Sequence, residues 1–128
     1  MVPAQGKVMD YGCGTAHVLL QAARKRKDLD VYLVDIPEAI TKDYAIWRFK
    51  KHGTRYTWLD IPENEQLIGV DGGLDFIRCH DVFEHTFHPD VVMNGFAAML
   101  KLAGIVSFDF MDNDGDYNKE KTKQSMER

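Results

Sequence analysis

The chain has 128 residues, 45% of them hydrophobic, which fits one globular domain with an ordinary core. Its formal net charge of -4 at pH 7 argues against a dedicated nucleic-acid groove. There is neither an apolar stretch of membrane-spanning length nor the apolar core of a signal peptide, and Cys13 and Cys79 lack paired spacing. We therefore expect a cytoplasmic protein with reduced thiols and neither a membrane nor a nucleic-acid partner.

Short apolar runs alternate with helix-like segments along the chain, with no repeat or low-complexity linker between them. The runs predict five strands, at residues 8–10, 31–34, 56–59, 74–79 and 105–108. This alternation implies parallel strands joined by right-handed crossovers. We predict an α/β fold over residues 1–111, a doubly wound, Rossmann-like, mostly parallel sheet with helices on both faces, and a polar C-terminal tail at 112–128.

Three helices are predicted between these strands. The first starts at Thr15, the second runs from Pro37 to Lys51, and the third starts at Pro89 and ends at Gly104. Helical spacing predicts their buried side chains, which are Val18, Leu19, Ala22 and Ala23 in the first helix, Ile40, Tyr44 and Trp47 in the second, and Val92, Phe96, Met99 and Leu100 in the third.

A glycine-rich turn, Asp10-Tyr11-Gly12-Cys13-Gly14-Thr15-Ala16, joins the first strand to the first helix. Gly12 allows a sharp turn, and Gly14 lets the backbone approach a ligand because it has no Cβ. The helix that follows directs its free N–H groups at the same place. Asp35 lies twenty-one residues beyond Gly14, close to the ~20 expected for an acid that binds ribose hydroxyls. The pattern predicts a site for a nucleoside-bearing cofactor.

This turn resembles that of class I S-adenosylmethionine-dependent methyltransferases more than that of nicotinamide dehydrogenases. The dehydrogenase fingerprint needs a third glycine three residues after the second, where this chain has His17. An acid at Asp10 would repel a pyrophosphate but suits a cationic sulfonium or ammonium. Ala16 replaces the third glycine of the methyltransferase pattern, a mild departure because alanine is the next smallest residue. A nicotinamide-dependent oxidoreductase is the distant alternative.

The resemblance covers about residues 5 to 111 and implies that residues 1–111 form an S-adenosylmethionine-binding domain. The acids Asp10, Asp35 and Asp60 all fall at predicted strand ends, where such sheets bind ligands. The roles implied by the resemblance are Asp10, Gly12, Cys13, Gly14 and the His80 backbone around the methionine part, Asp35 at the ribose hydroxyls, Ile36 against the adenine face, and Asp60 at the adenine amino group with Ile61 nearby.

The segment His80-Asp81-Val82-Phe83-Glu84-His85 is similar to the end of strand four in ubiquinone-biosynthesis-type O-methyltransferases. If it forms a helical turn, Asp81, Glu84 and His85 share one face. They would then hold Mg²⁺ or Zn²⁺ and polarise a substrate hydroxyl, although the metal-binding relatives carry a glutamate at the position of Asp81. Without a metal, His85 would act as the general base beside Glu84. Both versions imply a methyltransferase acting on a small molecule, at oxygen.

Complete members of this family add helices before the first strand and two further strands after the fifth. We therefore expect a truncated form that lacks the last two strands and leaves the fifth strand as an exposed apolar edge. Either the chain is a fragment of a longer protein, or a second copy or a partner chain covers that edge, and we expect the isolated chain to associate through it. The alternative function is a non-catalytic or incomplete cofactor-binding module, a fragment or subunit of a larger assembly.

Overall fold

The computed structural model describes residues 2–67, 70 and 72–109. Its elements are β1 (Lys7–Tyr11), α1 (His17–Lys25), β2 (Asp30–Asp35), α2 (Lys42–Lys51), β3 (Thr57–Asp60), β4 (Leu74–Cys79), the short 3-10 helix η1 (Phe83–His85), α3 (Pro89–Met99) and β5 (Leu100–Phe108). The five strands form one parallel sheet in the order β3-β2-β1-β4-β5. The predicted doubly wound α/β fold is confirmed, and the predicted polar tail lies outside the described residues.

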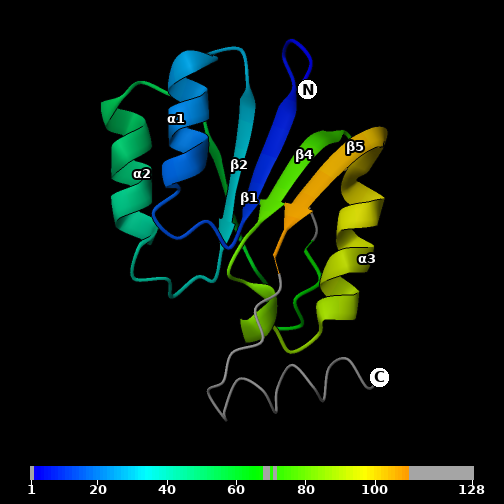
Figure 1. Ribbon diagram of the computed structural model, residues 1–128. Helices are drawn as coiled ribbons and strands as arrows, with labels where there is room; N and C mark the ends of the chain where they lie inside the picture. The colour runs from blue at the N-terminus through cyan, green and yellow to red at the C-terminus, as the bar shows by residue number, and fades with distance from the viewer. Residues whose placement is uncertain (1, 68–69, 71, 110–128) are drawn as a thin grey trace.

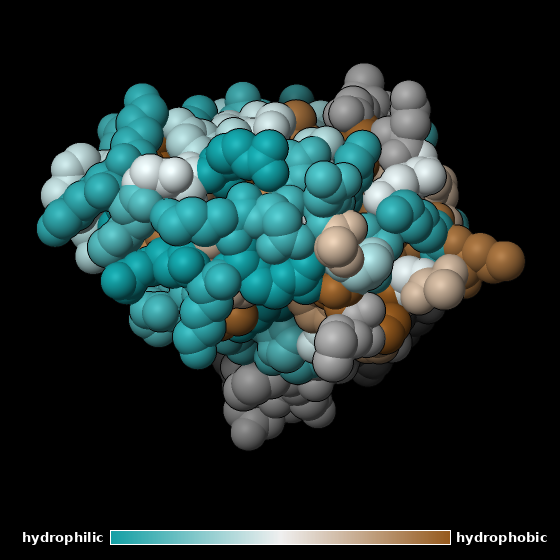
Figure 2. Space-filling view, turned by 90° about the horizontal axis from the view of Figure 1, so that it is seen from above, coloured by the Kyte–Doolittle hydropathy of each residue, from teal (hydrophilic) through white to brown (hydrophobic). Residues whose placement is uncertain are grey.

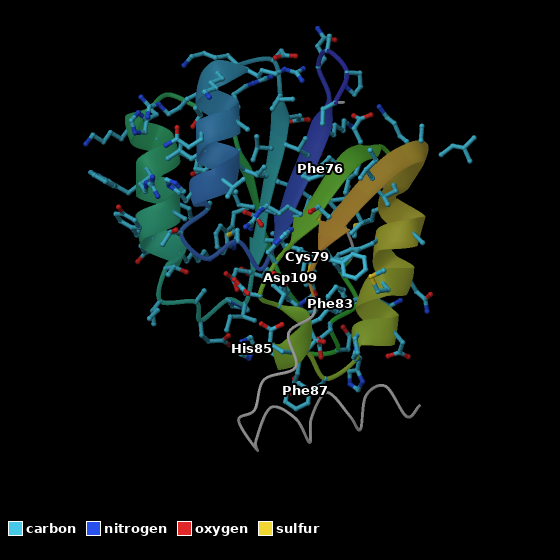
Figure 3. The ribbon with its side chains drawn as sticks, in the orientation of Figure 1. Phe76, Cys79, Phe83, His85, Phe87 and Asp109 are labelled. Atoms are coloured by element: carbon cyan, nitrogen blue, oxygen red, sulfur yellow. The ribbon has the colours of Figure 1, made fainter. Side chains whose placement is uncertain are left out.

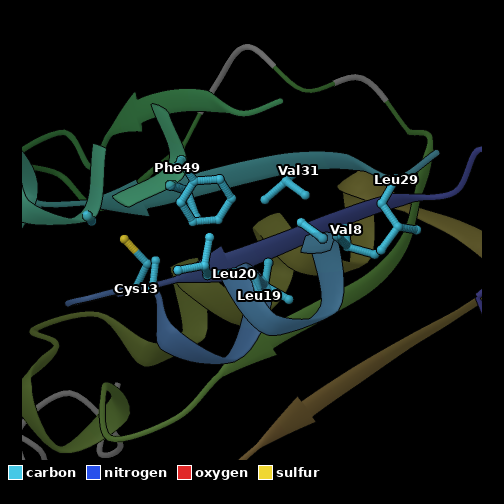
Figure 4. Packing of buried hydrophobic residues seen from close by; sticks show 11 residues of the cluster. Val8, Cys13, Leu19, Leu20, Leu29, Val31 and Phe49 are labelled. Carbon is cyan, nitrogen blue, oxygen red and sulfur yellow. The ribbon is translucent and has the colours of Figure 1, made fainter. Parts of the chain in front are cut away.

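Helices cover both faces of the sheet, with α1 and α2 on one face and α3 on the other (Figure 1). Side chains alternate between the two faces along each strand, so each layer has its own core. Val8 and Val31 pack with Leu20 and Phe49 of the α1–α2 layer (Figure 4). Met9 and its neighbours on the opposite face pack with the α3 layer. Cys13 and Cys79 are free and buried in different layers, as expected for reduced thiols.

The chain order of the strands reverses beside β1. From β1 the chain builds outward through β2 to β3, and then returns to place β4 on the other side of β1. The carboxyl ends of all five strands point to the same edge of the sheet (Figure 1). Open α/β sheets bind ligands at this edge, near the reversal point.

Helix α2 differs from its prediction in length and in orientation. It begins at Lys42 rather than Pro37, because residues 36–42 form consecutive turns. Ala45 and Phe49 face the core, whereas Tyr44 and Trp47 are 51% and 53% exposed. The two exposed rings stack on each other at 6.0 Å, with Lys51 over the ring of Trp47. Ile40 is almost fully exposed, so the predicted inward face of this helix was wrong.

Smaller corrections apply to α1. The helix begins at His17 and buries Leu19, Leu20 and Ala23, while Val18 is 45% exposed. The prediction of buried side chains in this helix was therefore right for Leu19 and Ala23 and wrong for Val18.

The transition from α3 to β5 also differs from the prediction. The helix ends at Met99, and β5 begins at Leu100, which has extended backbone angles. Gly104 therefore lies inside the strand and does not end the helix. A Cβ on Gly104 would crowd the Leu100 side chain and the carbonyl of Leu74, so this glycine lets β5 lie close to β4.

Strand β5 is an edge of the sheet and carries exposed apolar side chains. Leu102, Ile105 and Phe108 are among the exposed large hydrophobic residues. Seen from the amino ends of the strands, hydrophobic groups project on the side where β5 lies, while the side of α1 and α2 is mostly hydrophilic (Figure 2). Among the described residues, no helix is long and apolar enough to cross a membrane.

Candidate functional site

A cleft of about 900 Å³ lies at the carboxyl ends of β1, β2, β3 and β4. Its lining comes from the four segments that follow these strands, and consists of Tyr11, Gly12, Gly14, Asp35, Ile36, Pro37, Glu38, Asp60, Ile61, Pro62, Glu63, Glu65, Asp81, Val82, His85, Thr86 and Phe87. His85 and Phe87 lie beyond the strand ends in Figure 3. A cleft of this volume is large enough for a cofactor-sized ligand.

The glycine loop is held to the end of β2 by hydrogen bonds. The N–H groups of Gly12 and Cys13 both donate to the carbonyl oxygen of Val34, at 2.7 and 3.0 Å. Gly12 has φ +72°, and a Cβ on it would overlap Cγ2 of Val82, so the loop after β4 packs directly on this glycine. Gly14 has φ +54°, and no atom lies within 4 Å of the place its Cβ would take. Gly12 therefore allows Val82 to pack against the glycine loop, whereas Gly14 leaves open space beside the cleft.

Helix α1 begins directly after a strained residue. Ala16, at the position of the third glycine of the methyltransferase pattern, has φ +56° and ψ +32°. This left-handed conformation costs a residue with a Cβ roughly 1–2 kcal/mol. The methyl group of Ala16 is fully buried in the core between α1 and the sheet, which offsets part of that cost.

Asp35 connects the glycine loop to the segment after β2. Its Oδ2 accepts from the N–H of Gly14 at 2.9 Å, and its Oδ1 accepts from the N–H of Ile36 at 2.8 Å. Each carboxylate oxygen can accept more than one hydrogen bond. Asp35 therefore has acceptor capacity left for a ligand while it fixes the loop.

Asp60 lies beside Asp35 because the two residues are partners in the β2–β3 register. Its Oδ1 accepts from the indole N–H of Trp58 at 2.8 Å, and Lys42 Nζ is 3.6 Å away. Ile61 is bound through its N–H to the carbonyl of Asp35 at 2.8 Å. The predicted residues Asp35, Ile36, Asp60 and Ile61 thus lie together at one end of the cleft.

Asp10 does not line the cleft, although it belongs to the motif. It is 1% exposed and accepts from Nη1 of Arg78, its register partner on β4, at 3.3 Å. Burial raises the pKa of Asp10 to about 6, and the nearby Arg78 guanidinium offsets only part of this effect. The structure therefore places this acid in a buried ion pair outside the lining of the cleft.

Two other predicted cofactor residues also lie outside the lining. Cys13 is buried against the α1–α2 core beside Leu20 and Phe49, and burial raises the pKa of its thiol (Figure 4). His80 Nε2 lies 2.8 Å from Ser107 Oγ, and its Nδ1 lies 3.4 Å from Asp109 Oδ2. The predicted role of His80 concerns its backbone and stays a prediction.

The segment after β4 does not form the expected helical turn carrying three aligned ligands. Only Phe83–His85 is helical, as a single 3-10 turn, and Asp81 precedes it with φ +58°. Asp81 and His85 line the cleft, whereas Glu84 is 4% exposed and lies outside the lining. Glu84 Oε1 lies 3.9 Å from His85 Nε2. His85 is thus the predicted catalytic residue that reaches the cleft.

The expected metal ligands are not gathered into a site. Within residues 2–67, 70 and 72–109, no three His, Cys, Asp or Glu side chains are grouped so that they could hold a metal ion. Asp81 is separated from Glu84 and His85 by its left-handed turn, and its N–H is held by Asp109 Oδ1 at 2.7 Å. The geometry therefore gives no support to metal binding by Asp81, Glu84 and His85.

Several lining residues carried no signal in the sequence. Glu65 is 9% exposed with φ +60°, and its Oε1 accepts from the N–H groups of Phe87 and His88 at 2.7 and 3.1 Å. This carboxylate joins the loop after β3 to the loop after β4. Tyr11 and Val82 also belong to the lining. Contacts between residues so far apart in the chain leave no trace in local spacing.

The charge of the lining is one-sided. None of the described residues that line the cleft is Lys or Arg. Six of them carry a carboxylate, namely Asp35, Glu38, Asp60, Glu63, Glu65 and Asp81. Arg78, on the neighbouring strand β4, is paired with Asp10. Such a cleft favours cationic ligands over phosphates and other anions.

Comparison with known proteins decides the family. A family model described as "Methyltransferase domain" matches residues 2–128. The chain belongs to the methyltransferase-domain family. The resemblance seen in the glycine loop is therefore confirmed at the level of the family.

Two curated relatives match parts of this methyltransferase domain. The ubiquinone biosynthesis O-methyltransferase of Bordetella avium is 28% identical over 102 residues, which cover 80% of this chain and 41% of the relative. The probable cobalt-precorrin-6B C(15)-methyltransferase (decarboxylating) of Methanosarcina acetivorans is 35% identical over 71 residues, covering 55% and 38%. The chain thus spans about two fifths of the length of these relatives.

Solved structures confirm the fold. A SAM-dependent methyltransferase from Aquifex aeolicus is similar with a TM-score of 0.72 and 20% identity, over 94% of this chain and 66% of that one. Coclaurine N-methyltransferase, solved with N-methylheliamine and SAH, is similar with a TM-score of 0.70 and 18% identity, over 84% and 31%. At these identities the likeness concerns the Rossmann-like fold.

The two loop glycines are expected to respond differently to alanine. Gly12→Ala should lower the free energy of unfolding by about 2–4 kcal/mol, because a strained φ adds to the overlap with Val82. Gly14→Ala should cost about 1 kcal/mol, from backbone strain alone. Urea unfolding of each variant, repeated with Val82→Ala, tests this difference. Val82→Ala should restore part of the loss for Gly12→Ala only, and equal losses at both glycines would contradict the packing role of Gly12.

The raised pKa of Asp10 predicts how stability depends on pH. The folded state binds the Asp10 proton more tightly than the unfolded state, whose pKa is 3.8. Protonated Asp10 therefore adds to the free energy of unfolding, and this contribution is complete below pH 4. It is lost as the pH rises through about 6, which lowers the free energy of unfolding by up to about 3 kcal/mol. Urea unfolding between pH 4 and 7 should show this fall in the wild type and a flatter profile in Asp10→Asn. Parallel profiles for the two proteins would contradict it.

Proposed function

We propose that this chain binds S-adenosylmethionine in the cleft at the strand ends and transfers its methyl group to a small-molecule acceptor, at oxygen. The observation that carries the proposal is the acidic cleft beside Gly14, in a chain that belongs to the methyltransferase-domain family. A nicotinamide cofactor would bring a pyrophosphate into a lining with six carboxylates and no Lys or Arg among its described residues. The charge of the cleft thus favours the sulfonium cofactor over the nicotinamide alternative.

The residues present fit this cofactor. The open space at Gly14 allows a ligand to approach the backbone of the loop. Asp35 would accept from the ribose hydroxyls with its remaining acceptor capacity. Ile36, which is 49% exposed, would lie against the adenine face, with Asp60 and Ile61 at the adenine edge. When bound, the cofactor supplies an activated methyl group, so the protein need not supply a nucleophile of its own.

His85 is the residue we assign to the acceptor. It lines the cleft with a side chain that is 57% exposed, next to the buried Glu84. An acceptor hydroxyl must lose its proton when it attacks, and the His85 imidazole would take it. The rest of the lining would orient the acceptor and exclude water. The relatives named above include proteins described as O-, N- and C-methyltransferases, so the choice of oxygen depends on His85.

A second candidate function is a cofactor-binding module that does not catalyse methyl transfer. The observation in its favour is that Glu84, expected beside His85 in catalysis, is buried outside the lining. Incubation with cofactor labelled at its methyl group and a metabolite extract separates the two candidates. Label found in an extract component supports the enzyme, and cofactor binding without transfer supports the module.

Asp35→Ala is expected to lower the affinity for S-adenosylhomocysteine more than tenfold. The ribose would lose a charged acceptor, and the N–H of Gly14 would lose its partner. Calorimetric titration of both proteins measures the effect, after thermal unfolding has shown that the variant is folded. Asp43→Ala, which removes an exposed acid from the first turn of α2, is the matched control and should bind like the wild type. Equal affinity of Asp35→Ala and the wild type would contradict the assigned role.

We also propose that a second copy or a partner chain covers the edge strand β5. Ile105 and Phe108 of this strand are exposed, and its outer backbone pairs with no other described strand. Both features favour pairing with another chain. Light scattering should show association of the wild type at high concentration and less association of Ile105→Lys. A wild-type monomer at high concentration would contradict this proposal.

A further inference from the structure

Asp81 is an exposed acid of the cleft to which the proposed function gives no role. Of the six acids in the described lining, five end or follow β2 or β3. Asp81 instead follows β4, which lies on the other side of β1 from β2 and β3. It is therefore set apart from the ends of β2 and β3, where the proposed function places the ribose and the adenine.

The strand order indicates which part of the ligand reaches Asp81. Adjacent strands lie about 4.8 Å apart, so roughly 14 Å separates the end of β3 from the end of β4. A cofactor with its adenine at Asp60 and its ribose at Asp35 extends its amino-acid chain past the glycine loop toward β4. Val82 packs on Gly12, so Asp81, which precedes Val82, lies next to that loop.

The other acids near this end of the cleft are already engaged. Asp10, the acid that the resemblance implies for the methionine part, is 1% exposed, paired with Arg78 and outside the lining. Glu65 reaches the loop after β4, but it is 9% exposed and its Oε1 accepts from two backbone N–H groups of that loop. Asp81 is therefore the accessible acid on the β4 side of the described lining.

The backbone of Asp81 is held in a left-handed conformation, with φ +58°. Aspartate and asparagine tolerate this conformation better than most residues that carry a Cβ. The N–H of Asp81 donates to Oδ1 of Asp109 at 2.7 Å, and Oδ2 of Asp109 lies 3.4 Å from Nδ1 of His80. Asp109 follows β5 and lies at the strand ends in Figure 3. It therefore fixes the turn that carries the Asp81 side chain.

We propose that the Asp81 carboxylate is a specificity-determining group of the cleft, which binds the protonated amino group at the amino-acid end of the cofactor. Asp109 is a positioning residue, which acts through the backbone of Asp81. The inference rests on the proposed function for the class of ligand. A carboxylate and an ammonium group form a charge-assisted hydrogen bond, which is stronger than a neutral one.

The test compares two ligands that share the nucleoside part. S-adenosylhomocysteine carries the amino group, whereas methylthioadenosine lacks the amino-acid end. Asp81→Asn keeps the size of the side chain and tolerates the same φ, so the loop should keep its shape. It should lower the affinity for S-adenosylhomocysteine about five- to tenfold, because a charge-assisted hydrogen bond becomes a neutral one. Calorimetric titration should show unchanged affinity for methylthioadenosine.

Variants of Asp109 test its positioning role. Asp109→Ala should weaken S-adenosylhomocysteine binding and leave methylthioadenosine binding unchanged, because the turn at Asp81 loses its acceptor. Asp109→Asn keeps an oxygen that accepts from the same N–H, so it should bind like the wild type. Equal weakening of both ligands in Asp109→Ala, or no rescue by Asp109→Asn, would contradict this role.

Two further variants serve as controls. Asp90→Asn removes one exposed acid from the first turn of α3, outside the lining, and should bind both ligands like the wild type. Asp35→Ala should weaken both ligands, since both contain the ribose.

The outcomes separate this inference from the proposed function. Equal losses for both ligands in Asp81→Asn overturn it, because the residue then acts on the nucleoside part or on the loop. Unchanged affinity for S-adenosylhomocysteine also overturns it and leaves the proposed function standing. If the wild type binds neither ligand, the proposed function fails, and the ligand assigned to Asp81 fails with it.

Discussion

The cleft depends on the way the end of β2 holds the glycine loop. Three consecutive N–H groups, those of Gly12, Cys13 and Gly14, donate to two consecutive residues of β2, Val34 through its carbonyl and Asp35 through its carboxylate. The loop is therefore fixed by the neighbouring strand and not by its own sequence alone. Because Asp35 is one of these acceptors, the acid that we assign to the ribose also sets the shape of the loop beside it.

The strands were predictable because each is a short buried run in a parallel sheet. The predicted positions of all five match the observed strands, although β5 begins earlier than expected, at Leu100. The helix faces were less predictable. Apolar spacing placed Tyr44 and Trp47 inward, but these rings stack on each other and on cations at the surface, while Phe49 fills the core. Aromatic residues have enough polar and cationic contacts open to them that hydrophobicity alone does not decide which way they face.

The part of the site that comes from strand ends was also predictable. Asp35 and Asp60 follow buried runs, and the β2–β3 register brings them side by side. Asp10 looked the same in the sequence, yet β1 continues for one residue more, which leaves this acid inside the strand and turned to Arg78. The contacts of Glu65 with the loop after β4 depend on how two distant loops meet, and no local pattern carries that information.

The charge of the cleft follows from where the chain places its few neighbouring cations. Arg78 lies on β4, beside β1, where a free guanidinium would attract phosphate groups to the strand ends. Asp10 occupies that guanidinium from the buried side, although burial works against the ionised carboxyl and raises its pKa to about 6. The acid of the motif is therefore paired with a cation and lies outside the lining of the cleft. Lys42 Nζ, 3.6 Å from Asp60, offsets one of the six carboxylates of the lining. The other five leave the cleft acidic, and an acidic cleft favours a cationic cofactor.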